Sequence, residues 1–145
     1  MSQPKQTYAN HTRWYPAFHF FASPVTALAA LHLTWGAIRD PETHHILYAI
    51  YGWAIAVGVL AARAMAIRVQ DRLIQLEMRL RLKELLPAAL FARFGELTAK
   101  QVVALRFAGD GEMAGLVERV LKGELVKPKE IKLAIKDWKG DYLRA

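Results

Sequence analysis

Five histidines are the side chains of this 145-residue chain best suited to ligand chemistry at neutral pH. His19 and His32 lie inside an apolar stretch, where an imidazole could ligate a haem iron or a chlorophyll magnesium. These two are about 20 Å apart along a helix and on roughly opposite faces, so they cannot share one cofactor within a monomer. We therefore predict no cofactor, and ligation of haem or (bacterio)chlorophyll by His19 or His32 stays open as an alternative.

His44 and His45 follow two acidic residues, Asp40 and Glu42, in a short polar stretch. Imidazole and carboxylate groups suit zinc, but this spacing matches no closed zinc site, so we expect a loop facing water and no metal. The chain has no cysteine, which excludes disulfides and thiolate metal sites. No nucleophile beside a base, phosphate-binding glycine loop or paired carboxylate is visible in the sequence. The sequence therefore predicts a non-enzyme without a small-molecule substrate.

Two apolar stretches must position the histidines. Residues 17–38 and 46–62 contain no Asp, Glu, Lys or Arg. As a helix, the first is about 33 Å long and crosses the roughly 30 Å hydrocarbon core of a bilayer, with a kink expected at Pro24. The link 39–45 is short, so two such spans are expected to form an antiparallel transmembrane hairpin.

The positive charge lies mainly on one side of these stretches. Residues 63–145 carry 17 Lys and Arg against 11 Asp and Glu, and so supply most of the net charge of +7. By the positive-inside rule, both termini are expected in the cytoplasm, in a multi-pass membrane protein. Anionic lipid headgroups are the expected partners of the cations just beyond the second stretch. We name these the membrane-surface cations: Arg63, Arg68, Arg72, Arg79, Arg81 and Lys83.

The second span is expected to continue into water as one helix, because no Gly or Pro follows it until Pro87. Residues 63–86 form an amphipathic stalk in this reading. Its apolar stripe follows three- and four-residue steps through Val69, Leu73, Leu76 and Leu80, widened by Ile74, Met78 and Leu85. We expect the stripe to pack against the chain's own tail or a partner helix, and contact with an anionic lipid surface is the alternative.

Residues 87–145 are expected to form a small soluble helical tail. A capping box starts one helix at Thr98, Asp110 caps the next, and Pro128 opens a helix that Gly140 closes. About 59 residues make a marginal core, so the tail is expected to lean on the stalk or on another protein. The predicted all-α organisation is an N-terminal segment 1–15, a hairpin with stalk 16–86 (spans 17–38 and 46–62), and a tail 87–145.

Basic residues lie beside Trp138 and Tyr142 near the C-terminus, a pattern that can bind nucleic acid. Acidic residues are interspersed among them, which favours a solvated face or contact with an anionic membrane. We therefore do not expect nucleic acid as the partner. A membrane-anchored adaptor whose tail binds lipid or nucleic acid stays open as an alternative function.

Four motifs carry a family resemblance: Asn10-His11-x-Arg13, Pro16-x-x-His19-Phe20, Val69-Gln70-Asp71-Arg72 and Leu105-Arg106-Phe107-Ala108. With them, the chain resembles an uncharacterised family of small bacterial two-span membrane proteins. The resemblance spans nearly the whole chain and implies the same architecture in a bacterial inner membrane, but no activity, cofactor or catalytic residue.

Two polar groups flank the hairpin on its cytoplasmic side and are expected to pair with each other, locking its base. We name them together the hairpin-base cluster: Asn10, His11 and Arg13 before the first span, with Gln70, Asp71 and Arg72 after the second. These features together predict a non-catalytic accessory or assembly subunit of a larger membrane complex. A respiratory or photosynthetic complex is the expected host by analogy.

Overall fold

The computed structural model describes residues 6–12 and 14–142 of the chain. These residues form helices, turns and loops, with no strand among them beyond one isolated β-bridge between Ala108 and Trp138. The all-α class predicted from the sequence is confirmed. The described residues divide into two compact units, one of residues 14–68 and one of residues 6–12 with 69–142.

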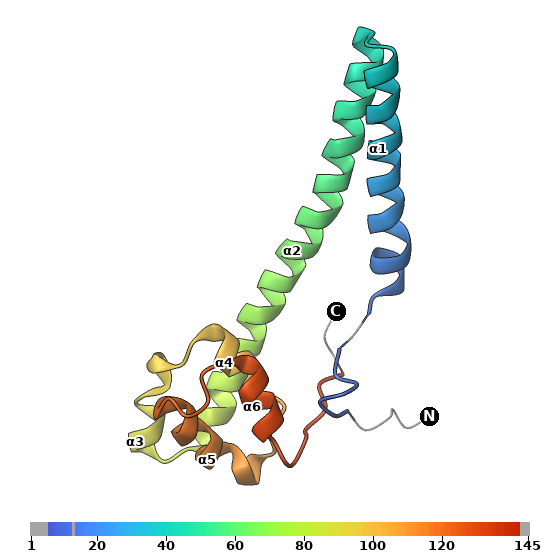
Figure 1. Ribbon diagram of the computed structural model, residues 1–145. Coiled ribbons are helices and arrows are strands. Elements are labelled where there is room, and N and C mark those ends of the chain that lie inside the picture. Colours follow the sequence, from blue (N-terminus) through green and yellow to red (C-terminus); the bar gives the residue numbers. More distant parts are fainter. Residues whose placement is uncertain (1–5, 13, 143–145) are drawn as a thin grey trace. The chain divides into compact units, whose positions relative to one another are not determined.

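The first unit begins with a π-helix, η1 (Ala17–Ala22), which continues directly into α1 (Ser23–Arg39) (Figure 1). Pro24 lies in the first turn of α1. It has no N–H to donate, and in a regular α-helix its ring would clash with the carbonyl four residues earlier. The wider π-helical turn accommodates this, and the N–H of Ser23 donates to the carbonyl of Phe18, five residues back. The irregularity expected at Pro24 is therefore a π-helical segment.

Helix α2 (Thr43–Leu85) is continuous over 43 residues and ends just before Pro87, as the sequence predicts. The first apolar stretch likewise forms helix throughout, from Ala17 to Arg39. Both helices are long and apolar enough to cross a membrane.

Within the first unit, α1 and the beginning of α2 run side by side in opposite directions (Figure 1). Gly52 allows a close approach, because a β-carbon there would lie 3.0 Å from Cδ1 of Leu33 and 3.1 Å from Cα of Ala30. The next residue, Trp53, donates its indole N–H to the Thr34 hydroxyl of α1 at 3.0 Å. A small residue at the contact and a hydrogen bond between helices are both typical of helix pairs in membranes.

The second unit joins the end of α2 to five short helices. These are α3 (Ala88–Phe91), the 3₁₀-helix η2 (Phe94–Glu96), α4 (Ala99–Leu105), α5 (Asp110–Leu121) and α6 (Pro128–Ala134). Ile74, Met78 and Leu82 of α2, with Leu86 just after it, enter a core that the apolar residues of α4, α5 and α6 complete. The tail thus buries its apolar side chains against the last part of the long helix, which compensates for its small size.

Two helix starts in the tail were predicted from local signals. The capping box at Thr98 is confirmed: the Thr98 hydroxyl accepts from the Gln101 N–H at 3.3 Å, and the Gln101 side chain accepts from the Thr98 N–H at 2.8 Å. Asp110 is not the N-cap of α5, because Gly109 takes that place and Asp110 is the first helical residue. Its carboxylate accepts hydrogen bonds from Arg81 instead of capping the backbone.

The last helix is shorter than predicted. Helix α6 ends at Ala134, well before Gly140. Both carboxylate oxygens of Glu112 on α5 accept a backbone N–H, from Lys136 and from Asp137, at 3.0 Å each. These contacts, with the β-bridge at Trp138, hold residues 135–140 out of the helix, so tertiary contacts override the local helix signal.

The face of α2 that packs into the core also differs from the predicted stripe. Ile74 and Met78 are 5% and 3% exposed, whereas the four main stripe residues are 54–69% exposed: Val69, Leu73, Leu76 and Leu80. At 100° per residue, Ile74, Met78 and Leu82 lie on the opposite side of the helix from that stripe. The tail therefore covers Ile74 and Met78, two of the residues predicted to widen the stripe, and leaves the four main stripe residues uncovered.

Candidate functional site

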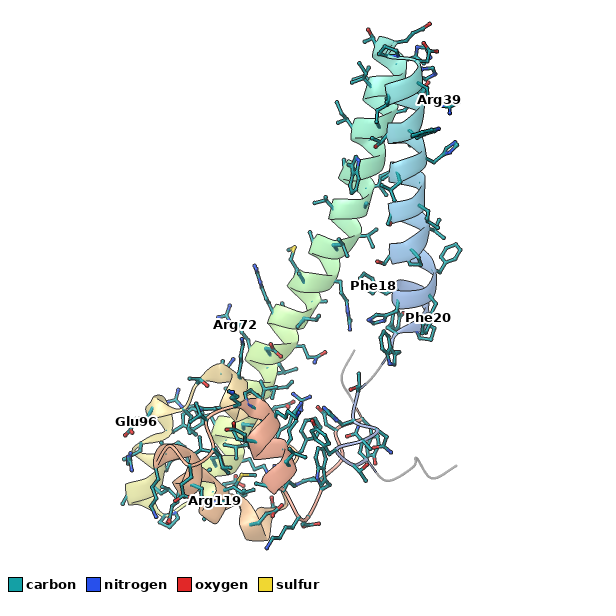
Figure 2. All side chains as sticks on the ribbon, viewed as in Figure 1. Phe18, Phe20, Arg39, Arg72, Glu96 and Arg119 are labelled. Atoms are coloured by element: carbon teal, nitrogen blue, oxygen red, sulfur yellow. The ribbon has the colours of Figure 1, made fainter. Side chains whose placement is uncertain are left out.

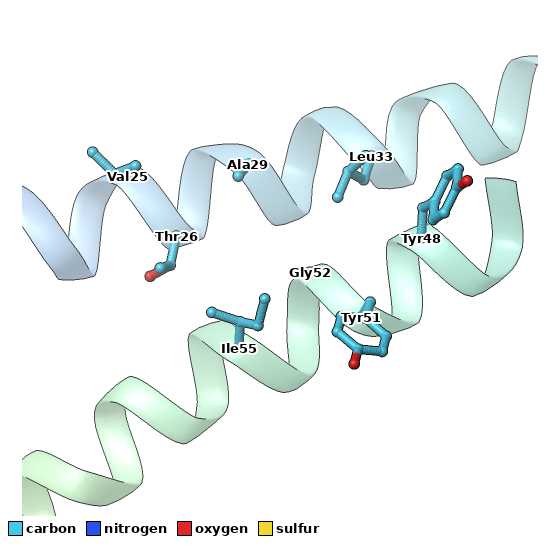
Figure 3. A pocket seen from close by; sticks show the side chains of 8 residues that line it. All are labelled: Val25, Thr26, Ala29, Leu33, Tyr48, Tyr51, Gly52 and Ile55. Atoms are coloured by element: carbon cyan, nitrogen blue, oxygen red, sulfur yellow. The ribbon is translucent and has the colours of Figure 1, made fainter.

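An apolar groove lies between α1 and α2 in the first unit (Figure 3). It has a volume of about 490 Å³. Its lining comprises Val25, Thr26, Ala29 and Leu33 of α1 and Tyr48, Tyr51, Gly52 and Ile55 of α2. The Thr26 hydroxyl donates to the Ala22 carbonyl of its own helix at 2.7 Å, which leaves the two tyrosine hydroxyls as the other polar groups of the lining. The groove suits a hydrocarbon chain or an apolar side chain of a neighbouring helix.

Large apolar side chains project outward around the helices of the first unit (Figure 2). Phe20 and Phe21 are 68% exposed, Ile38 is 69% exposed and Tyr51 is 72% exposed. In the most apolar 18-residue stretch of each long helix, few residues are buried: 6% within Ala17–Arg39 and 17% within Thr43–Leu85. An apolar surface of this extent calls for lipid or protein to cover it.

Cations stack on aromatic rings towards both ends of this helix pair. The Arg63 guanidinium lies 5.7 Å from the ring centroid of Phe18, and that of Arg39 lies 4.8 Å from the ring of Trp35. Aromatic rings beside cations are typical of the boundary between hydrocarbon and headgroups. Both pairs are therefore well placed to mark the ends of a membrane-spanning region.

The two histidines predicted as cofactor ligands lie apart on the same helical segment. Nδ1 of His19 is 3.0 Å from both the backbone N and O of Tyr15, and its ring packs edge-on against Trp14 at 4.9 Å between centroids. His32 is exposed on α1. Ligation of haem or (bacterio)chlorophyll by either histidine stays an open alternative to the prediction of no cofactor.

His44 and His45 were expected in a loop but lie in the first turn of α2, where they pair with the neighbouring carboxylates. Nδ1 of His44 lies 3.2 Å from Glu42, and Nδ1 of His45 lies 2.8 Å from the backbone oxygen of Asp40. In the part of the chain that the structure describes, no three potential ligand side chains gather in a way that could hold a metal ion. These contacts tie down the turn between α1 and α2.

In the second unit, the N-terminal residues 6–12 bind to the tail, an arrangement we call the N-terminal clasp. The side chain of Gln6 exchanges two hydrogen bonds with the backbone of Asp141, at 2.9 and 3.3 Å. Nζ of Lys132 donates to Nε2 of His11 at 3.0 Å, so Nδ1 carries the proton of a neutral His11 and donates to the Tyr8 carbonyl at 2.6 Å. The clasp thus joins residues more than 120 positions apart.

An aromatic cluster lies beneath the clasp. The fully buried Phe107 is 5.0 Å from Trp138 and 5.7 Å from His11 between ring centroids, and the Arg106 guanidinium lies 4.4 Å from its ring. Nε of Arg106 lies 2.9 Å from Oδ2 of Asp141. Sequence reasoning missed the Arg106–Asp141 pair, because nothing in the local sequence links charges on segments so far apart.

The structure places members of the hairpin-base cluster in different contacts. Oδ1 of Asn10 accepts from the Thr7 N–H at 2.6 Å. Asp71 borders a small pocket together with Lys132, the residue that donates to His11. Arg13 lies outside the described residues, and the mutual pairing of the cluster remains a prediction.

Arg81 differs from the other membrane-surface cations of the second unit. Its guanidinium donates to the Asp110 carboxylate from Nε at 2.9 Å, and to the backbone oxygens of Ala108 and Arg106 at 2.6 and 3.2 Å. The hydrogen bond from Arg81 is the main cause that holds the pKa of Asp110 below its usual range; burial opposes this, and the charges of Arg81 and Lys139 add to it. Arg81 thus binds the tail, whereas Arg72, Arg79 and Lys83 are exposed.

Comparison with known proteins defines the class of the chain and goes no further. Residues 1–145 match the family of unknown function DUF6526, and the chain belongs to that family. The resemblance to an uncharacterised family inferred from the sequence motifs is thereby confirmed. No curated protein and no solved structure matches the chain.

Proposed function

We propose that this protein is a non-catalytic integral membrane subunit that supports the assembly of a larger membrane complex. The observation that carries the proposal is the surface of the first unit, where two apolar helices expose most of their large side chains. A helix pair with so little buried surface needs a surrounding apolar phase. In the proposed arrangement, it is a two-span hairpin in a bacterial inner membrane.

The charge distribution supports a cytoplasmic location for both termini. The link between the helices carries one Arg against Asp40 and Glu42, whereas the stretch after Arg63 is strongly basic. Positive residues are retained on the cytoplasmic side. The exposed members of the membrane-surface cations would then lie near anionic headgroups, each contributing about 1 kcal/mol when close to the surface.

The apolar groove supports a protein partner within the membrane. Its lining offers shape and apolar contacts but no charged group, which suits a side chain of a neighbouring transmembrane helix. An energy-transducing complex, respiratory or photosynthetic, remains the proposed host by analogy.

Extraction from native membranes in mild detergent tests this proposal. The tagged chain should migrate inside a large complex on a native gel, and mass spectrometry of that band should return the same partner subunits in each preparation. A chain that migrates alone after mild extraction contradicts the proposal. An absorption spectrum of the same sample tests the alternative, since a haem or chlorophyll on His19 or His32 would absorb visible light.

A groove-filling substitution sharpens this test. We expect Ala29→Leu to reduce recovery of the partner subunits, because the added side chain occupies the groove. Ala27→Leu is the matched control: Ala27 is exposed on the same helix but does not line the groove. Equal recovery of the partners by both variants would show that the groove is not the contact.

A further inference from the structure

The uncovered face of α2 in the second unit is a regular apolar seam. Val69, Leu73, Leu76 and Leu80 are separated by steps of four, three and four residues, and their exposed fractions are 69%, 54%, 56% and 58%. This is the spacing of the inner positions a and d of a coiled coil, with Val69 and Leu76 at d and Leu73 and Leu80 at a. We refer to these four residues as the seam. Lys83, at the next d position, ends it.

Charged residues flank the seam with one sign on each side. Arg72 and Arg79 occupy the g positions, and Glu77 and Glu84 occupy the e positions. All four side chains are exposed, and Figure 2 shows Arg72 projecting from α2. Among residues 6–12 and 14–142, none of these four forms an ion pair.

This charge pattern is complementary to itself in one orientation only. In a parallel, in-register pair of helices, a g residue faces the e residue five positions later on the partner. Arg72 would then face Glu77 of a second copy, and Arg79 would face Glu84, twice per dimer by symmetry. In an antiparallel pair, arginines would face arginines and glutamates would face glutamates. The sequence thus favours the parallel pair and disfavours the antiparallel one.

The tail leaves room for such a partner. The α2 side chains that it covers, Ile74, Met78 and Leu82, are at the b, f and c positions, which point away from a coiled-coil partner. Two copies can therefore meet along the seam without displacing the tail of either one.

We propose that the seam is a homodimerisation surface, through which two copies of this chain form a short parallel coiled coil. Two heptads are marginal for an isolated coiled coil. Anchoring in one membrane would raise the effective concentration of the two helices and make them run in the same direction. Only this membrane argument rests on the proposed function.

Disulfide cross-linking of the full chain in native membranes tests the proposal, because the chain has no cysteine of its own. Leu76→Cys on the seam should form a disulfide-linked dimer under mild oxidation. Gln75→Cys, one residue away on the face turned from the partner, is the matched control and should give several-fold less. Leu73→Cys repeats the measurement at an a position, in case Leu76→Cys fails to accumulate. The proposal is overturned if the yield of disulfide-linked dimer at both seam positions is no greater than at Gln75→Cys. It is also overturned if the cysteines capture a different protein in place of a second copy.

Charge reversal then tests the parallel register. In the Leu76→Cys background, Glu77→Arg/Glu84→Arg should lose most of the dimer, and so should Arg72→Glu/Arg79→Glu. Co-expression of the two variants with different tags should restore cross-linking between unlike copies. Glu77 also borders a groove lined by Arg81 and Arg106, so its replacement could act through that groove. Co-expression of a Glu84→Arg copy with an Arg79→Glu copy repeats the charge exchange away from the groove. If the charge reversals leave the dimer yield unchanged, the proposed Arg–Glu pairs between copies are wrong. The same follows if the two unlike variants both accumulate but fail to cross-link to each other.

Discussion

At the scale of single residues, Arg81 shows how a cation that looks like part of a basic surface can have a structural role. Its side chain is 19% exposed, and its guanidinium reaches one carboxylate and two backbone oxygens of the segment that leads from α4 into α5. Sequence alone groups it with its exposed neighbours, since spacing on α2 does not reveal what the tail brings to each face. The planar guanidinium fits several acceptors at once, which a lysine could not reproduce.

Replacement of Arg81 should therefore destabilise the second unit. We expect Arg81→Met to reduce its stability by about 2 kcal/mol, because two backbone oxygens and a carboxylate lose a charged donor. Thermal unfolding of the full chain in detergent, followed by circular dichroism, measures the loss. Lys129→Met, an exposed change on α6 of the same unit, should leave the melting temperature nearly unchanged; equal effects would contradict the role given to Arg81.

The Asp110 carboxylate predicts an acid dependence of stability. Its pKa is lower in the folded chain than in the unfolded one, because it accepts hydrogen bonds from Arg81. The resulting stabilisation is present above the unfolded pKa and is lost as the pH falls through the folded one. Asp110→Asn should therefore lower the melting temperature at pH 7, and the gap to the wild type should narrow towards pH 3. Glu118→Gln, which removes an exposed carboxylate 3.8 Å from Lys122, serves as the control. A gap independent of pH would contradict the prediction.

At the scale of elements, features encoded within a few residues could be predicted from the sequence. The continuous α2 and the capping box at Thr98 are examples, because both depend on neighbouring residues. The early end of α6 could not be predicted, since it depends on Glu112 from another helix. The packed face of α2 was predicted only in part: Ile74 and Met78 were included in the stripe, but its centre was placed on the opposite face. The helix carries apolar residues on both faces, and only the tail decides which of them is buried.

The contact between α1 and α2 depends on the small size of Gly52. A larger side chain there would meet the backbone of Ala30 and force the helices apart. We expect Gly52→Val to reduce the thermal stability of the chain in detergent by about 1–3 kcal/mol. Gly36→Val is the control, since a β-carbon at Gly36 has nothing within 4 Å. The same loss in both variants would indicate a general effect of removing a helical glycine instead of a helix–helix contact.

At the scale of the whole molecule, the two units differ in the solvent that each needs. The first exposes most of its large aromatic and aliphatic side chains, whereas the second has an apolar core of its own and exposes mainly the seam of α2. These two surfaces support the proposal that the first unit is a membrane anchor and that the second lies in water. The candidate site of the first unit, its apolar groove, could not be predicted from the sequence, because it depends on where Gly52 and Ala29 leave space between packed helices.

Cysteine labelling in intact cells tests the proposed membrane topology most directly, because every introduced cysteine is the only one in the chain. Glu42→Cys lies in the link between α1 and α2, and Lys122→Cys lies at the exposed end of α5. A maleimide that cannot cross the inner membrane should label Glu42→Cys in intact cells, and should label Lys122→Cys only after the membrane is opened. Labelling of Lys122→Cys in intact cells, or recovery of the chain in the soluble fraction, would contradict a two-span protein with both termini in the cytoplasm.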